Sequence, residues 1–187
     1  MNARAQDARW LTLEEYGALP EDDGYRDELS RGLLVREPQP GALHCDVQGN
    51  VYSMLRARQE AGRGRAVTGA GFLLSVDPPT VRGPDAAFIV GARLPSVAPP
   101  TGWWAVAPDL AVEVLSPSNR PAEMRAKLRD YFGAGTRLVW IVDPRSRSVM
   151  VHHADGSVRR LSERDELDGG EVLPEFRVRV AELFAWP

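Results

Sequence analysis

The stretch from Pro108 to Pro144 constrains the fold more than any other part of this sequence. Residues 110–115 and 138–144 are short apolar runs rich in β-branched side chains, which predicts two buried strands. Residues 121–134 between them carry apolar side chains at helical spacing, and Gly135 follows, which predicts a helix with one buried face. A strand, a helix and a strand over this length predict a parallel strand pair joined by a right-handed crossover.

Two charged residues in this unit need a physical explanation. Glu113 lies inside the first apolar run, where a carboxylate is costly unless a cation pairs with it or a metal binds it. Lys127 is the only lysine among 23 lysines and arginines, and lysine offers a compact ammonium with a tunable pKa that arginine does not. One interpretation is that a buried acid requires ammonium chemistry here. The other is chance, with Lys127 forming an ordinary i,i+4 ion pair with Glu123.

Length and composition exclude several classes of protein. With 187 residues, we expect one domain over residues 1–187, of which residues 1–9 are flexible. The net charge of −3 gives no general attraction to nucleic acid, so DNA binding must depend on a local patch or a metal. A single cysteine, Cys45, excludes a disulfide framework and a four-cysteine zinc site. No apolar run reaches the roughly 20 residues of a membrane span and no signal peptide is evident, so we expect a cytoplasmic protein without membrane contact.

The rest of the chain predicts short strands, hairpins and one more long helix. Residues 91–102 are a Pro-rich loop that suits a mobile flap. The other elements expected from periodicity and turn residues are a helix over 13–19, a turn at 21–24, a hairpin of strands 25–29 and 33–37, a helix over 42–61 and strands over 66–68 and 72–76. The stretch 81–90 places Asp85 at the mouth of an apolar strand. After the central unit we expect a hairpin of strands 148–152 and 158–161, a turn at 168–170, an extended segment over 172–176 and a helical turn over 180–184.

The long helix over residues 42–61 has a clear apolar stripe. Leu43, Val47 and Val51 begin this buried face, with Met54 and Leu55 continuing it, and His44 lies at its edge. Arginines gather at the end of the helix, which more often forms a solvated face than a phosphate-binding patch. They are Arg56, Arg58, Arg63 and Arg65.

Three acids lie on or beside apolar strands: Glu28, Asp85 and Glu113. If they converge, their carboxylates make an oxygen-ligand site for Mg²⁺, which lowers the pKa of a bound water and offsets charge on a phosphate. Lys127 would then hold that water or balance the acids.

Each of these residues also has a purely structural interpretation. Asp85 could only turn the chain at a strand entrance, and Glu28 fits a salt bridge to Arg26 or Arg31 as well as it fits a metal. His44 is more often a satisfied histidine than a ligand. The tryptophans at positions 103, 104 and 140 suit a core or dimer interface better than base stacking.

Pro84-Asp85, then Glu113-Val114-Leu115-Ser116-Pro117, then Lys127 resemble the PD-(D/E)xK nuclease superfamily. More closely, the chain resembles the Uma-two family of restriction-endonuclease-like proteins, and the similarity covers nearly its whole length. The matching blocks lie at residues 11–16, 28–29 with Gly32, His44, 84–85, 108–118, Lys127 with Tyr131 and Gly135, and 139–144.

The resemblance implies an α/β (α+β) fold, a mixed sheet flanked by helices with hairpins near both ends, and a homodimer. It implies that Asp85 and Glu113 are ligands of Mg²⁺, for which Mn²⁺ could substitute, and that Lys127 is the catalytic lysine. Glu28 would be an accessory acid and His44 would line the site. The superfamily usually has its lysine two residues after the second acid, where this chain has Leu115; here the following helix supplies it.

Three functions follow from these patterns. The first is an endonuclease that hydrolyses DNA with metal-activated water. The second is a catalytically inactive module of the same fold that binds nucleic acid or protein, which the net charge of −3 favours mildly. The third is a metal-dependent hydrolase of another phosphate ester.

Overall fold

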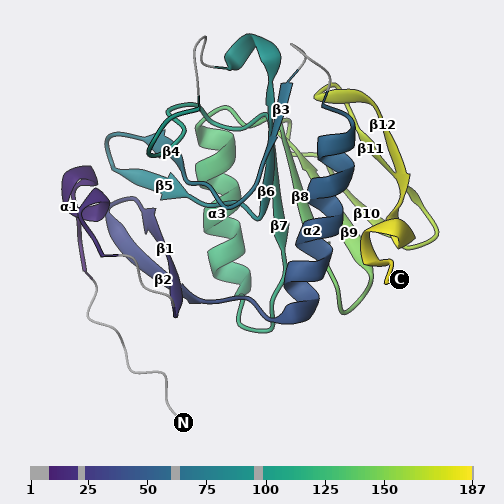
Figure 1. The fold of residues 1–187 in the computed structure, drawn as a ribbon, viewed down its shortest axis with the longest axis horizontal. Helices are drawn as coiled ribbons and strands as arrows, with labels where there is room; N and C mark the ends of the chain where they lie inside the picture. The colour runs from purple at the N-terminus through teal and green to yellow at the C-terminus, as the bar shows by residue number, and fades with distance from the viewer. Residues whose placement is uncertain (1–8, 21–23, 60–63, 95–98, 187) are drawn as a thin grey trace.

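A six-stranded mixed sheet forms the centre of the computed structural model, which describes residues 9–20, 24–59, 64–94 and 99–186 (Figure 1). Its strand order is β10-β9-β8-β7-β6-β3, and only β7 and β8 pair in parallel within it. The predicted strand, helix and parallel strand are therefore confirmed. The strands are β3 (Gly64–Val67), β6 (Ala86–Val90), β7 (Leu110–Val114), β8 (Leu138–Asp143), β9 (Ser148–His153) and β10 (Val158–Ser162).

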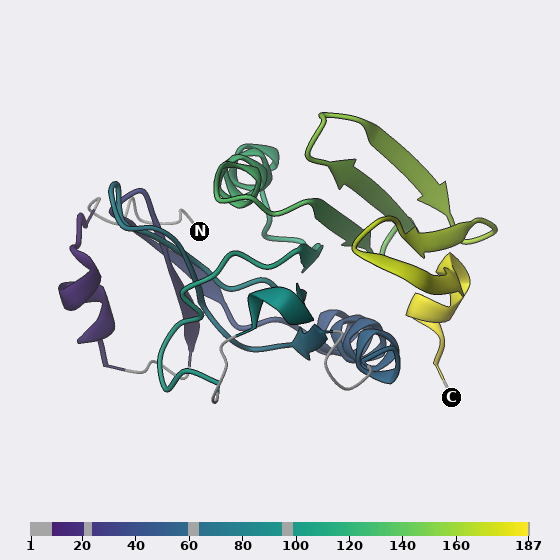
Figure 2. The same ribbon diagram turned by 90° about the horizontal axis from the view of Figure 1, so that it is seen from above.

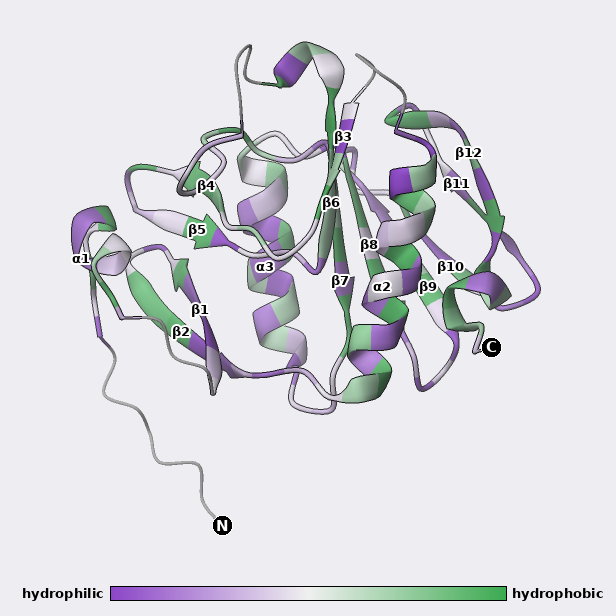
Figure 3. Ribbon diagram, viewed as in Figure 1, coloured by the Kyte–Doolittle hydropathy of each residue, from purple (hydrophilic) through white to green (hydrophobic). Residues whose placement is uncertain are grey.

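Helices α2 (Ala42–Ala57) and α3 (Pro121–Gly133) cover opposite faces of this sheet (Figure 2). Successive side chains of a strand point to opposite faces, so alternate residues of β7 pack toward α2 and toward α3. Val112 packs in the core that contains the apolar face of α2, whereas Ala111 packs with Tyr131 of α3. Figure 3 shows the consequence: the central strands are mostly hydrophobic, while both helices carry hydrophobic and hydrophilic residues. Glu113 points toward α3.

A second sheet, of order β2-β1-β5-β4, carries the predicted N-terminal hairpin. Arg31 and Gly32 both have positive φ and close its two-residue turn, as a type I′ turn requires. The capping box at Thr12 and Glu15 is also present. The elements are α1 (Leu13–Gly17), β1 (Tyr25–Ser30), β2 (Leu33–Pro38), β4 (Phe72–Ser75) and β5 (Thr80–Arg82).

The C-terminal part completes the core on the face of the central sheet that α2 also covers. The predicted hairpin is present as β9 and β10, and the predicted helical turn is present as a 3-10 helix. The remaining strands form a two-stranded sheet of their own, and Phe176 packs on Trp140 with ring centroids 5.2 Å apart. The remaining elements are η1 (Gly91–Arg93), β11 (Glu166–Gly169), β12 (Leu173–Arg179) and η2 (Val180–Phe184).

Several boundaries differ from the sequence predictions. The apolar strand that follows Asp85 is present as β6, but the residues before it form a separate strand, β5, in the other sheet, because Gly83 and Pro84 separate the two and proline cannot donate to a ladder. The residues predicted as a turn at 168–170 include the end of β11, since pairing with β12 overrides their turn chemistry. Helix α2 ends at Ala57 rather than residue 61.

The apolar stripe of α2 is confirmed at Val47, Val51 and Leu55, and only its first position, Leu43, was wrong. Leu43 is exposed and His44 is buried, because His44 continues the row of Val47, Val51 and Leu55 toward the sheet. Trp104 and Trp140 are core residues, as expected. The predictions for residues 1–8, the turn at 21–23, residues 60–61, Arg63 and the flap at 95–98 lie outside the described residues. Within the described residues, every helix is too short or too polar to cross a membrane.

Candidate active site

Five residues predicted from the sequence meet at the lower end of the central sheet. Glu28 lies in β1, His44 in the first turn of α2, Asp85 just before β6, Glu113 in β7 and Lys127 in α3. They meet there because β6 begins where β7 ends, so the residue that enters β6 lies beside Val114. Of the two helices that flank the sheet, α2 then adds His44 and α3 adds Lys127.

Asp85 is almost completely buried, and three donors of the chain hold it. Arg26 donates to Oδ1 over 2.9 Å, while His44 Nε2 lies 3.1 Å from Oδ2 and the Val114 amide donates to Oδ2 over 2.7 Å. Burial alone would raise the pKa of Asp85, but the hydrogen bond and charge of His44, together with Arg26, hold it below the usual range. Asp85 is therefore a charged member of a cluster and does more than turn the chain.

Glu113 is held at both oxygens by residues one helical turn apart. Lys127 Nζ donates to Oε2 over 3.0 Å, and the Tyr131 hydroxyl donates to Oε1 over 2.6 Å. Burial, with repulsion from Asp85 and Glu28, raises the pKa of Glu113 to about 7, although Lys127 opposes the shift. Tyr131 was expected on the buried face of the helix and in a block that resembles the family, but no role at the site was predicted for it; its i,i+4 relation to Lys127 was the signal available.

Lys127 forms ion pairs with three acids of the site. Its Nζ lies 3.0 Å from Glu113, 3.3 Å from Glu28 and 3.4 Å from Glu37, and its side chain is only 4% exposed. Burial lowers the pKa of Lys127, but the three carboxylates raise it by more than burial lowers it. The net shift is upward, so the amine keeps its proton. The alternative of a surface pair between Lys127 and Glu123 is wrong; the partner of Glu123 is Arg120.

Glu28 forms a salt bridge, although with neither of the predicted arginines. Arg82 donates to it over 2.8 Å and the Gly83 amide over 2.9 Å. The pairing of Leu29 with Val81 places Glu28 and Arg82 opposite each other on antiparallel strands, a relation that a single sequence does not reveal. Arg82 also binds Asp130 of α3. These contacts tie the second sheet to the helix that carries Lys127.

The acids open onto a cavity of about 180 Å³, bordered by Asp85, Glu113 and His44. Ser116 and Asn119, in the loop after β7, form part of its rim. Within the described ranges, no cluster of three or more His, Cys, Asp or Glu side chains forms a ready metal site.

Two carboxylates still fit a hard cation that keeps most of its waters. Burial first, and then repulsion from Asp85 and Glu28, raises the pKa of Glu113, and a divalent cation beside this carboxylate would favour its ionised form.

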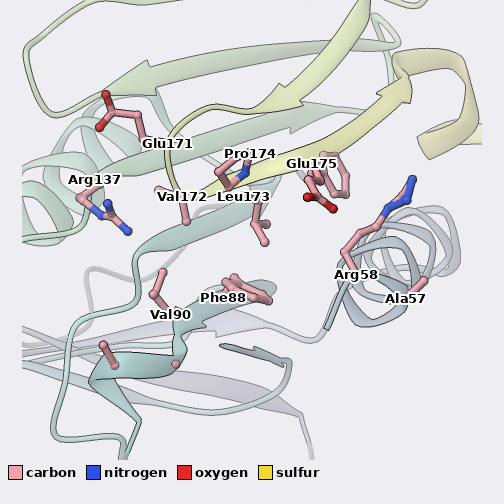
Figure 4. Close-up of a pocket in the computed structure, with 13 residues that line it drawn as sticks. Ala57, Arg58, Phe88, Val90, Arg137, Glu171, Val172, Leu173, Pro174 and Glu175 are labelled. Atoms are coloured by element: carbon pink, nitrogen blue, oxygen red, sulfur yellow. The ribbon is translucent and has the colours of Figure 1, made fainter. Parts of the chain in front are cut away.

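A larger cavity, of about 680 Å³, lies away from these acids (Figure 4). Phe88, Val172 and Leu173 give it an apolar lining, with Arg58 and Arg137 at its borders. It lies toward the far end of β6 from Asp85, and none of the predicted site residues borders it. Cavity size is therefore a poor guide to the candidate site in this protein.

Comparison with known proteins gives one family and one fold. The model of the family described as "Uma2: Putative restriction endonuclease" matches residues 13–181. The crystal structure of a "putative nuclease belonging to DUF820" from Anabaena variabilis ATCC 29413 is similar with a TM-score of 0.82, covering 93% of this chain and 97% of that one at 21% identity. At that identity the likeness shows the fold alone. Comparison with curated proteins gives no match.

Proposed function

The chain belongs to the Uma2 family, as its motifs predict, and on this premise we propose that it is a Mg²⁺-dependent endonuclease that hydrolyses phosphodiester bonds of DNA. The family supports a nuclease-like function in general. One observation carries the finer proposal: Asp85 and Glu113 border the same cavity, and the only lysine of the chain lies 3.0 Å from Glu113.

Asp85 and Glu113 would hold the metal, Mg²⁺ or Mn²⁺ in its place, because both are carboxylates at one cavity. When bound, such a metal lowers the pKa of a water and offsets negative charge on the phosphate. His44 would keep Asp85 ionised and oriented, since it lies 3.1 Å from the second oxygen of that carboxylate.

Lys127 would act as a hydrogen-bond donor and fixed positive charge. Its raised pKa makes it a poor general base, so it would orient the attacking water and stabilise charge on the phosphate rather than remove a proton. Glu28 would be accessory through Lys127, from which it lies 3.3 Å. Arg82 would in turn fix Glu28.

A second candidate is a catalytically inactive module that binds nucleic acid or protein. Two observations favour it. The net charge is −3, and both oxygens of Asp85 and of Glu113 already accept hydrogen bonds from donors within the chain, so these acids do not need a metal. This candidate predicts no affinity of the acids for divalent cations.

Titration calorimetry with Mn²⁺ separates the two candidates. The nuclease proposal predicts millimolar or tighter binding that is lost in Asp85→Asn, together with Mg²⁺-dependent cleavage of plasmid DNA that is lost in Glu113→Gln. Circular dichroism should show that both variants keep the fold. A wild-type protein without Mn²⁺ affinity, or cleavage unchanged in Glu113→Gln, would reject the mechanism.

The resemblance also supports a homodimer. Light scattering should then give the mass of two 20.6 kDa chains. A mass of one chain at micromolar concentration would contradict this part of the proposal.

A further inference from the structure

Arg26 differs from the other cations that hold the acids, because it alone reaches solvent. Its side chain is 34% exposed, whereas Lys127 and Arg82 are 4% and 3% exposed. Lys127 contacts three carboxylates, and Arg82 is anchored to Glu28 and Asp130. Among the residues that the structure describes, Arg26 forms an ion pair with one partner, Asp85.

Asp85 does not depend on Arg26 alone. His44 and the Val114 amide both hold its Oδ2, while Arg26 binds Oδ1. If Arg26 leaves, one oxygen keeps its donors and the other becomes free. An oxygen that can be freed without displacing the carboxylate is what an incoming cation requires.

Arg26 also stands between two cavities. It lines the cavity of about 180 Å³ that Asp85 and Glu113 also line. It lines as well a neighbouring cavity of about 280 Å³, which Glu28 and Trp103 border. Glu37 is the other residue common to both linings. A side chain in this place can turn toward either cavity and stay close to the acids.

Three nearby acids favour a positive charge at the position of Arg26. Burial lowers the pKa of Arg26, but Asp85, Glu37 and Glu113 raise it above its ordinary value. Two of these acids are the proposed metal ligands. A divalent cation and a guanidinium would therefore compete for the same negative charge.

We propose that Arg26 is an exchangeable counter-ion: it neutralises Asp85 while no divalent cation is bound, and cation binding releases its guanidinium to hold the phosphate of the substrate. This inference rests on the proposed nuclease function. The guanidinium suits the second role because its planar fork matches two phosphate oxygens. Lys127 and Arg82 are too enclosed to exchange in this way.

Titration calorimetry of the full chain with Mn²⁺ tests whether Arg26 competes with the divalent cation. Removing the competing charge in Arg26→Gln should lower the Mn²⁺ dissociation constant at least about fivefold, and Arg26→Lys should lie between this variant and the wild type. The matched control is Arg159→Gln, since Arg159 also pairs with an aspartate, Asp168, over 2.8 Å but lies in the C-terminal hairpin. That variant should bind Mn²⁺ as the wild type does.

Oligonucleotide binding with and without Ca²⁺ tests whether the released guanidinium of Arg26 binds the phosphate of the substrate. Ca²⁺ should increase the affinity of the wild type for DNA, and Arg26→Gln should lose most of that increase although it binds the cation more tightly. Unchanged or weaker Mn²⁺ affinity in Arg26→Gln, or an undiminished Ca²⁺ effect on DNA binding, would overturn the inference and leave the nuclease proposal standing. A wild type that binds no Mn²⁺ would overturn the proposed function itself.

Discussion

The hydroxyl of Tyr131 donates to Glu113 over 2.6 Å at a position where neither residue reaches solvent appreciably. Tyr131→Phe keeps the ring but leaves one oxygen of a buried carboxylate without its donor. We expect a loss of about 1–3 kcal/mol in the free energy of unfolding. Burial and the lost hydrogen bond both favour the protonated acid, so the loss should be larger at pH 8 than at pH 5. Urea denaturation at the two pH values measures it.

The control for this variant is Tyr25→Phe, because Tyr25 is exposed. Its free energy of unfolding should change by less than about 0.5 kcal/mol at either pH. Equal losses in Tyr131→Phe at pH 5 and pH 8 would show that the hydroxyl does not discriminate between the charged and neutral forms of Glu113.

Glu113 itself should make stability fall as the pH rises. Its pKa is raised from 4.5 to about 7 in the folded chain, so the folded state holds the proton more tightly than the unfolded state. The resulting stabilisation is complete below pH 4.5 and is lost as the pH rises through 7. Glu113→Gln cannot titrate, so its stability relative to wild type should increase by up to about 3 kcal/mol between pH 4.5 and pH 8.

Denaturant unfolding of both proteins across this range measures the difference. A constant difference between them would mean that the carboxylate stays ionised throughout, with Lys127 outweighing burial. Mg²⁺ should reduce the difference at pH 8 if the metal binds the ionised acid, since a ligand of the folded state stabilises it.

Arg82 should be far more important to stability than an exposed arginine. It bridges Glu28 and Asp130, which join β1 to α3, and all three are buried or nearly so. Arg82→Met fills much of the volume but leaves two enclosed carboxylates without this partner, so we expect a loss of about 3–5 kcal/mol. Arg159→Met removes an exposed pair and should cost less than about 1 kcal/mol. Thermal unfolding of both variants compares them, and similar losses would refute the role of Arg82.

The sequence predicted the central unit because its signals are local. The apolar runs at β7 and β8, and the helical spacing between them, depend on neighbours a few residues away. Glu113 was recognisable as unusual for the same reason, since an acid inside an apolar strand needs a partner. Its partners on α3 could be inferred only from their position after that strand and from the family resemblance.

The errors arose where distant segments meet. The bond between Glu28 and Arg82 joins residues 54 positions apart, and strand pairing alone creates it. The burial of His44 rather than Leu43 depends on where Asp85 lies below α2. The bond between Glu28 and Arg82 has no local signal, whereas His44 had one in its helical spacing to Val47, although a polar side chain does not indicate burial. Strand β11 was missed because its turn-forming residues are extended only when β12 pairs with them.

The isolation of Lys127 in an arginine-rich chain leads to the last prediction. Three carboxylates lie 3.0–3.4 Å from its Nζ, and the side chain is enclosed, so the site fits a compact ammonium. Lys127→Arg keeps the positive charge, but the planar guanidinium is wider than the ammonium and overpacks the site. It should cost about 1–3 kcal/mol and lower Mg²⁺-dependent cleavage at least about 100-fold.

Lys127→Met tests charge separately from shape. It leaves the three acids without their common cation, so it should destabilise the chain by about 3–5 kcal/mol at pH 8 and by less at pH 5, where Glu113 is largely protonated. Chemical denaturation and plasmid cleavage of both variants give the answer. If Lys127→Arg cleaved DNA at the wild-type rate, any cation would serve at this position. The single lysine would then reflect chance in composition rather than the geometry of the acids.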